Sequence, residues 1–158
     1  MRLLRDGGRS SDQISRVTAV NSRLDEIQCC YLRAFLPHLA DWNAQRVRIA
    51  DIYDGSLRDC PGVRPVRRGP GSVSHLYVIR AEKRERLREY LSHRGVTAGV
   101  HYPVPLHLQP AFRACGLRRG ALPNAESACS EVVSLPLWPY MPESTAMGVA
   151  AFVRSFYK

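Results

Sequence analysis

Several features that would place this chain in a familiar class are missing from its 158 residues. No run of residues is long and apolar enough to cross a membrane. The first residues, MRLLRDGGRSSD, lack the apolar core of a signal peptide. The five cysteines are odd in number and include no C-x-x-C pair, which argues against a disulfide framework. We therefore expect a cytoplasmic, globular protein with free thiols and no membrane partner.

Lysine is scarce although the chain is basic. Lys83 and Lys158 are the two lysines among 23 basic residues, and the net charge is +9. A basic chain raises nucleic acid as a partner, but the arginines are spread along this one. The densest basic stretch, residues 83–89, is interleaved with acids, as on a solvated helix face. A nucleic-acid binder is therefore the weakest hypothesis, and its only support is charge.

The stretch NSRLDEIQCC at residues 21–30 has the pattern of a helix start. Ser22 can act as an N-cap, and Asp25 three residues later completes a capping box. Apolar residues then follow at helical spacing, which predicts a helix over 22–36. A second helix is predicted from Pro37 to about Asp54, ended by Gly55.

The first turn of that predicted helix has the groups that bind a phosphate. It would combine free backbone N–H groups and the helix dipole with the side chains of Asn21 and Arg23. An ordinary helix cap with a solvated arginine explains the same residues.

The remainder of the chain mixes helices and strands. The patterns predict strands over 72–80, 96–101 and 132–135, and helices over 82–93, 125–131 and 142–157. Loops are expected at 1–20, at 60–72 and at 102–123, where proline and glycine gather. This order favours an α+β fold, with a sheet of three to four strands and helices packed on one side.

Four motifs occur in an order and at spacings that are familiar. They are NSRLDEIQ (21–28), HLYVIR (75–80), GVHYPVPLHLQP (99–110) and SLPLWP (134–139). Together they make the chain resemble the C-terminal part of the DegT/StrS-type sugar aminotransferases. These are dimeric enzymes of the aspartate-aminotransferase fold that depend on pyridoxal phosphate (PLP). They transfer an amino group onto a keto sugar carried on a nucleotide.

The resemblance also implies that parts of the enzyme are missing. Family members are more than twice as long, and the lysine that forms the Schiff base lies before the segment matched here. Lys83 lies among charges on an amphipathic helix and Lys158 is the last residue, so neither offers the desolvated pocket that such a lysine needs. We predict no catalytic residue in this chain and no activity on its own.

The resemblance assigns two groups of binding residues. Asn21 would reach across the dimer interface to the phosphate of the partner subunit's PLP, and Arg23 beside it would help. His101 and Tyr102 would line the cleft that faces the nucleotide sugar, with His107 behind them. A metal site is not expected, because two histidines without a nearby acid are a poor ligand set.

The predicted organisation has three parts: residues 1–20 as a tether, 21–58 as connecting and dimer-interface helices, and 59–158 as the small α+β domain. The favoured hypothesis is the C-terminal portion of a PLP-dependent aminotransferase, which forms a homodimer or pairs with a full-length or N-terminal partner chain. The alternative is a non-catalytic dimerisation or assembly module, or a gene remnant. Apolar faces over 24–53 would drive such assembly.

Overall fold

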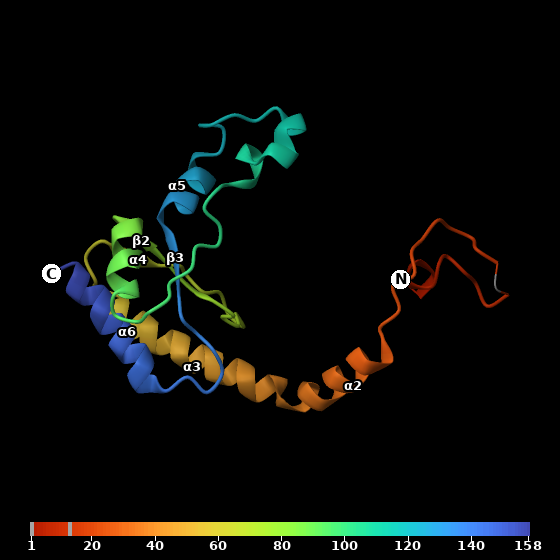
Figure 1. Ribbon diagram of the computed structural model, residues 1–158, viewed down its shortest axis with the longest axis horizontal. Coiled ribbons are helices and arrows are strands. Elements are labelled where there is room, and N and C mark those ends of the chain that lie inside the picture. Colours follow the sequence, from red (N-terminus) through yellow and green to blue (C-terminus); the bar gives the residue numbers. More distant parts are fainter. Residues whose placement is uncertain (1, 13) are drawn as a thin grey trace. The chain divides into compact units, whose positions relative to one another are not determined.

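The computed structural model describes residues 2–12 and 14–158, and the chain divides into two compact units, Met1–Ala40 and Asp41–Lys158 (Figure 1). The first unit contains α1 (Arg2–Arg5), α2 (Glu26–Phe35) and the 3-10 turn η1 (Leu36–His38). The second contains the sheet and the remaining helices, together with nearly all of α3 (Leu39–Leu57).

The first unit has more structure than the loop expected over residues 1–20. After α1 the backbone turns through Gly7 and Gly8, and antiparallel bridges pair Asp6 with Asn21 and Arg9 with Ser15. Gly8 is required here, because its φ is +75° and an added Cβ would lie 1.8 Å from the carbonyl oxygen of Val17.

The predicted capping box at Ser22 and Asp25 is wrong. The helix α2 begins at Glu26, and its N-cap residue Asp25 makes no side-chain capping bond. Ser22 lies in extended chain and donates its backbone N–H to the carbonyl of Arg5 at 2.8 Å. A contact with α1 therefore replaces the local cap, and Asn21 lies in a bridge rather than on a first helical turn.

The second unit is built on a three-stranded antiparallel sheet in the order β1-β2-β3. Its strands are β1 (Val63–Pro65), β2 (Tyr77–Ala81) and β3 (Val132–Leu135). Tyr77 pairs with Leu135 and Ile79 with Val133, so these side chains share one face. The α+β fold with a three-stranded sheet is thereby confirmed, and β3 has the predicted bounds.

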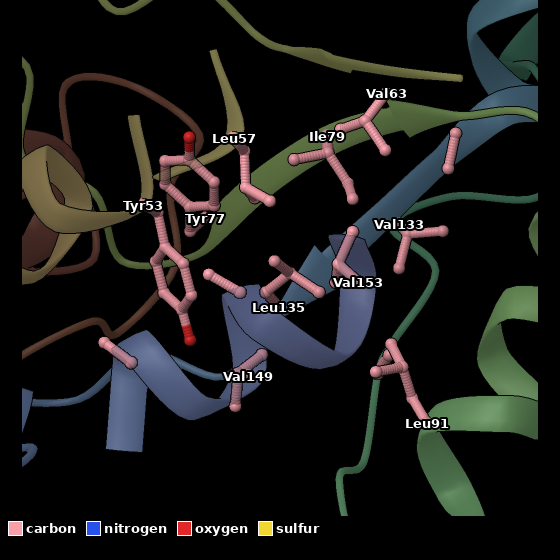
Figure 2. Close-up of a cluster of buried hydrophobic side chains, with 14 of the residues drawn as sticks. Tyr53, Leu57, Val63, Tyr77, Ile79, Leu91, Val133, Leu135, Val149 and Val153 are labelled. Carbon is pink, nitrogen blue, oxygen red and sulfur yellow. The ribbon is translucent and has the colours of Figure 1, made fainter. Parts of the chain in front are cut away.

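That face of the sheet carries the core (Figure 2). Buried side chains meet it from three helices: α3, α4 (Arg84–Ser92) and α6 (Glu143–Phe156). Leu57, Ile79, Leu91 and Val153 are fully buried. Such burial of apolar surface is the main stabilising contribution in a domain of this size. Contacts near both ends of α6 join it to α3: Glu143 pairs with Arg48, and Arg154 donates to the Ser56 carbonyl at 3.0 Å.

Several elements differ from their predicted bounds, as β2 does by beginning at Tyr77 rather than at residue 72. Three of the differences have tertiary reasons. The predicted loop over 60–72 contains β1, because β2 supplies backbone partners on that side. The predicted strand over 96–101 is reduced to one bridge between Gly99 and Ser134. Gly55 does not end α3, which continues to Leu57 because Leu57 packs into the core.

Shorter elements complete the second unit. They are the 3-10 turns η2 (Leu106–Leu108) and η3 (Pro110–Cys115) and the helix α5 (Pro123–Glu131). None of the helices seen in the described residues is long and apolar enough to span a membrane.

Candidate functional site

The first candidate surface lies on the side of β3 that faces away from the core. Ser134 alternates with the core residues Val133 and Leu135, yet it is only 3% exposed. The segment after α4 covers it, because Gly99 and Ser134 exchange two backbone hydrogen bonds of 3.0 and 2.9 Å. The bridge therefore sets the position of the chain just before His101.

His101 is fixed by this bridge. Its Nδ1 lies 2.9 Å from the hydroxyl oxygen of Ser134, within hydrogen-bond distance. The ring also passes over Gly99, where an added Cβ would lie 2.7 Å from the His101 Cε1. Glycine at position 99 is thus a consequence of the close approach of the imidazole.

Tyr102 follows and points its ring toward solvent. It is 70% exposed, and its ring meets that of His101 edge-on at 5.7 Å between centroids. These two predicted binding residues, which are neighbours in the sequence, therefore form an exposed pair. An imidazole and a phenol at one surface can donate and accept hydrogen bonds and stack against a ring.

His107 differs from that exposed pair because its side chain is buried. Its side chain is 4% exposed, and Nε2 lies 2.9 Å from a carboxylate oxygen of Glu126 on α5. The carboxylate also accepts the N–H of Gly120 at 2.8 and 3.0 Å. Desolvation acts to raise the pKa of Glu126, but the hydrogen bond from His107 and those from the backbone lower it overall.

Glu126 and Ser134 are site residues that the sequence reasoning missed. Neither stands near its histidine in the sequence, and a single Glu on a short helix has no distinguishing pattern. No group of three or more potential metal ligands occurs within residues 2–12 and 14–158.

A cleft of about 820 Å³ lies elsewhere on the second unit. Its lining includes Arg58, Arg67 and Arg68, with Asp54. None of the predicted binding residues borders it. Arg68 is itself neutralised by two carboxylates, since it donates to Asp51 and Asp54 at 2.5 Å each.

The second candidate surface is in the first unit, around Asn21 and Arg23. Both residues are exposed, and Arg23 Nε lies 3.5 Å from the Asn21 Oδ1 and 3.2 Å from an Asp6 carboxylate oxygen. Both contacts use Nε, whereas a phosphate is ordinarily held by the forked N–H groups of a guanidinium. The donor set of one amide and one guanidinium therefore fits a phosphate, without the helix N-terminus that the sequence pattern predicted.

Both lysines are exposed on the second unit. Lys83 stands at the N-cap of α4 with a left-handed backbone, and Lys158 ends the chain. Neither lies in the apolar surroundings that turn a lysine into a nucleophile at neutral pH.

The comparison with known proteins decides the family. The model of the DegT/DnrJ/EryC1/StrS aminotransferase family matches residues 1–154. The chain belongs to this family. The family membership that the four motifs suggested is thereby confirmed.

Two curated relatives are similar over nearly the whole of this chain. The chain is 41% identical to the erythromycin biosynthesis sensory transduction protein EryC1 of Saccharopolyspora erythraea, over 98% of its own length and 43% of the relative's. It is 38% identical to the dTDP-3-amino-3,4,6-trideoxy-alpha-D-glucose transaminase of Streptomyces venezuelae, over 99% and 42% of the two lengths. The chain thus spans less than half the length of these relatives, as the motifs predicted.

Solved structures agree. The crystal structure of DesV from S. venezuelae matches with a TM-score of 0.93 at 38% identity, over 99% of this chain and 43% of DesV. A DegT/DnrJ/EryC1/StrS aminotransferase from Brucella abortus matches with a TM-score of 0.89 at 33% identity, over 99% and 42% of the two chains. The fold of this chain is therefore the C-terminal part of a family aminotransferase.

Proposed function

We propose that this chain supplies the C-terminal part of a PLP-dependent aminotransferase that acts on nucleotide-linked keto sugars. The observation that carries the proposal is the family match over residues 1–154, combined with an exposed His101–Tyr102 pair where the family resemblance expects a cleft wall. The named transaminase activity of the S. venezuelae relative supports the same substrate class.

The chain's residues would contribute binding rather than the proton-transfer step. PLP, when bound, supplies the electron sink for amino-group transfer. Asn21 and Arg23 would hold its phosphate in a partner subunit, with Asn21 as the main donor, because Asp6 already balances part of the charge on Arg23. His101 and Tyr102 would orient the sugar nucleotide and exclude water on one side of the cleft.

The Schiff-base lysine would come from the N-terminal part of the enzyme, which lies outside the matched segment. The helix α2 offers a surface on which a partner chain could pack. No residue of α2 is buried, although Ile27, Tyr31 and Leu32 are apolar and more than half exposed. Exposed apolar surface of this extent is typical of an interaction site. We therefore expect a homodimer or a pairing with a longer or N-terminal chain. The cysteine pattern, which argues against a disulfide framework, favours the cytoplasm as its location. A purely non-catalytic assembly module is the second candidate that this helix supports.

The first experiment tests whether the chain alone can use PLP. PLP is added to the purified chain, the visible spectrum is recorded, and borohydride reduction is followed by mass mapping of Lys83 and Lys158. We expect no specific pyridoxyl-lysine. One uniquely labelled lysine that disappears in the matching Lys→Arg variant would show that the chain has its own Schiff-base site.

The second experiment separates a split enzyme from an assembly module. The chain is mixed with a separately expressed N-terminal portion of the S. venezuelae relative, and PLP retention and transamination are measured. Activity that depends on both parts supports the proposal, whereas stable association without PLP uptake supports the module. Asn21→Ala should weaken PLP retention more than Arg23→Ala does, and Arg16→Ala, an exposed arginine of the same unit, is the control.

A further inference from the structure

The loop between the strand-like bridge at Gly99 and the start of α5 is long and has little regular structure. Its 3-10 turns η2 and η3 bury only His107. Loops of this length need anchors to keep one conformation. The structure shows two side-chain anchors, one on either side of Tyr102.

The first anchor is the contact of His101 with Ser134 on β3, described above. The second is the contact of His107 with Glu126 on α5. Between them lie Tyr102 and four residues that include Pro103 and Pro105, whose rings restrict the backbone. The exposed Tyr102 is thus carried on a short, stiff segment held at both ends.

Glu126 does more than hold His107. Besides the two bonds from Gly120, it accepts the N–H of Leu122 at 3.4 Å, so one carboxylate closes the far end of the loop onto the first turns of α5. The side chain of Glu126 is 15% exposed and that of His107 only 4%. Leaving the buried imidazole of His107 without its hydrogen-bond partner would cost free energy, so the folded chain favours the contact between His107 and Glu126.

We propose that Glu126 is a positioning residue that clamps the 102–122 loop through His107 and Gly120 and thereby fixes Tyr102 for substrate binding. The clamp itself is a property of this chain. Its effect on substrate rests on the proposed function.

The clamp is tested on the chain alone by limited trypsin digestion. Arg118 and Arg119 lie in the exposed turn that Glu126 holds, and they are natural cleavage sites. We expect Glu126→Ala to speed cleavage there by about tenfold, since the buried His107 loses its partner and the turn opens. Glu126→Gln, which keeps an acceptor oxygen, should fall between that variant and the unchanged chain.

The control is Glu131→Gln on the same helix. Glu131 accepts bonds from Arg80 at 2.7 Å and from Arg64 at 3.0 Å, and its hydrogen bonds within the described residues go to β1, β2 and its own helix. The Glu131→Gln variant should leave the rate of cleavage after Arg118 and Arg119 unchanged. Hydrogen exchange at the amides of Gly120 and Leu122 should speed up in the Glu126 variants alone. Unchanged cleavage in both Glu126 variants overturns the proposal. Cleavage that rises equally at Arg80, inside β2, also overturns it, because that is general unfolding.

The consequence for substrate is read in the active complex with the N-terminal part. Glu126→Ala should raise KM for the nucleotide sugar several-fold and change kcat little, with partial recovery in Glu126→Gln. An unchanged KM in an active complex refutes the positioning role. A complex that is inactive even without substitution counts against the proposed function and not against the clamp, which the digestion decides.

Discussion

The bond between Tyr77 and Asp54 gives the sharpest test of how the core of the second unit is held together. Tyr77 is 2% exposed, and its ring stacks on that of Tyr53 at 4.7 Å between centroids. Its hydroxyl donates to Asp54 Oδ1 at 2.6 Å, and Arg68 donates to Asp54 Oδ2. Burial, with Asp54 adding to it, raises the pKa of Tyr77, so the hydroxyl stays protonated and donates.

The cost of Asp54→Ala follows from these contacts. The buried hydroxyl loses its acceptor, which costs about 1–3 kcal/mol. The partly exposed pair with Arg68 adds at most about 1 kcal/mol. We expect a loss of about 2–3 kcal/mol in the free energy of unfolding, or a Tm lower by roughly 8 °C. Tyr77→Phe alone should cost about 1 kcal/mol, because no group is left buried without a partner.

A double-mutant cycle measured by urea unfolding checks this reasoning. In the Tyr77→Phe background, Asp54→Ala should cost about 1 kcal/mol less than it does alone, since there is no hydroxyl left to strand. Asp51→Ala is the control: Asp51 contacts Arg68 but not Tyr77, its side chain is 63% exposed, and its loss should stay within about 0.5 kcal/mol. Equal effects of Asp51→Ala and Asp54→Ala, or strict additivity in the cycle, would refute the role assigned to the hydroxyl.

Two further predictions concern the surface of β3 and the acid sensitivity of the fold. Gly99→Ala should displace the His101 ring from Ser134, seen as a changed imidazole NMR signal with the fold retained; an unaltered signal would contradict the close approach. The hydrogen bond from Arg80, and after it the one from Ser127 on α5, hold the pKa of Glu131 below its usual range. A lowered pKa in the folded state means that this stabilisation is present above the ordinary carboxyl pKa of about 4.3 and is lost as the pH falls below that value and through the lower folded one. The urea midpoint should therefore fall on acidification less in Glu131→Gln than in the unchanged chain, and identical slopes would show that the pair is not linked to folding.

Much of the architecture could be predicted because it depends on local pattern. The strand predicted over 132–135 places Val133 and Leu135 on the core face, and the helical spacing around Leu87 and Leu91 buries both in α4. The residues His101 and Tyr102 could be chosen because their motif resembles a family motif, and both are exposed in the structure. Their role in substrate binding stays a prediction.

What failed was decided by partners distant in the chain. Nothing in NSRLDEIQ shows that the N–H of Ser22 binds Arg5, which removes the predicted cap and starts α2 at Glu26. In the same way, Pro65 joins a strand because β2 lies beside it. A capping box or a proline-rich loop is a local preference of about 1 kcal/mol, which a tertiary hydrogen bond or strand pairing readily overrides.

By itself, then, the sequence determined the family, the α+β class, the core faces and the scarcity of lysine in this segment. Only the tertiary structure decided which groups meet: Ser134 with His101 across 33 positions, and Glu126 with His107 across 19. The physical reason is that the periodicity of apolar side chains predicts which face of a helix or strand is buried, and many residues contribute to that face together. A hydrogen bond instead depends on whether a donor and an acceptor carried by two distant segments come within about 3 Å of each other.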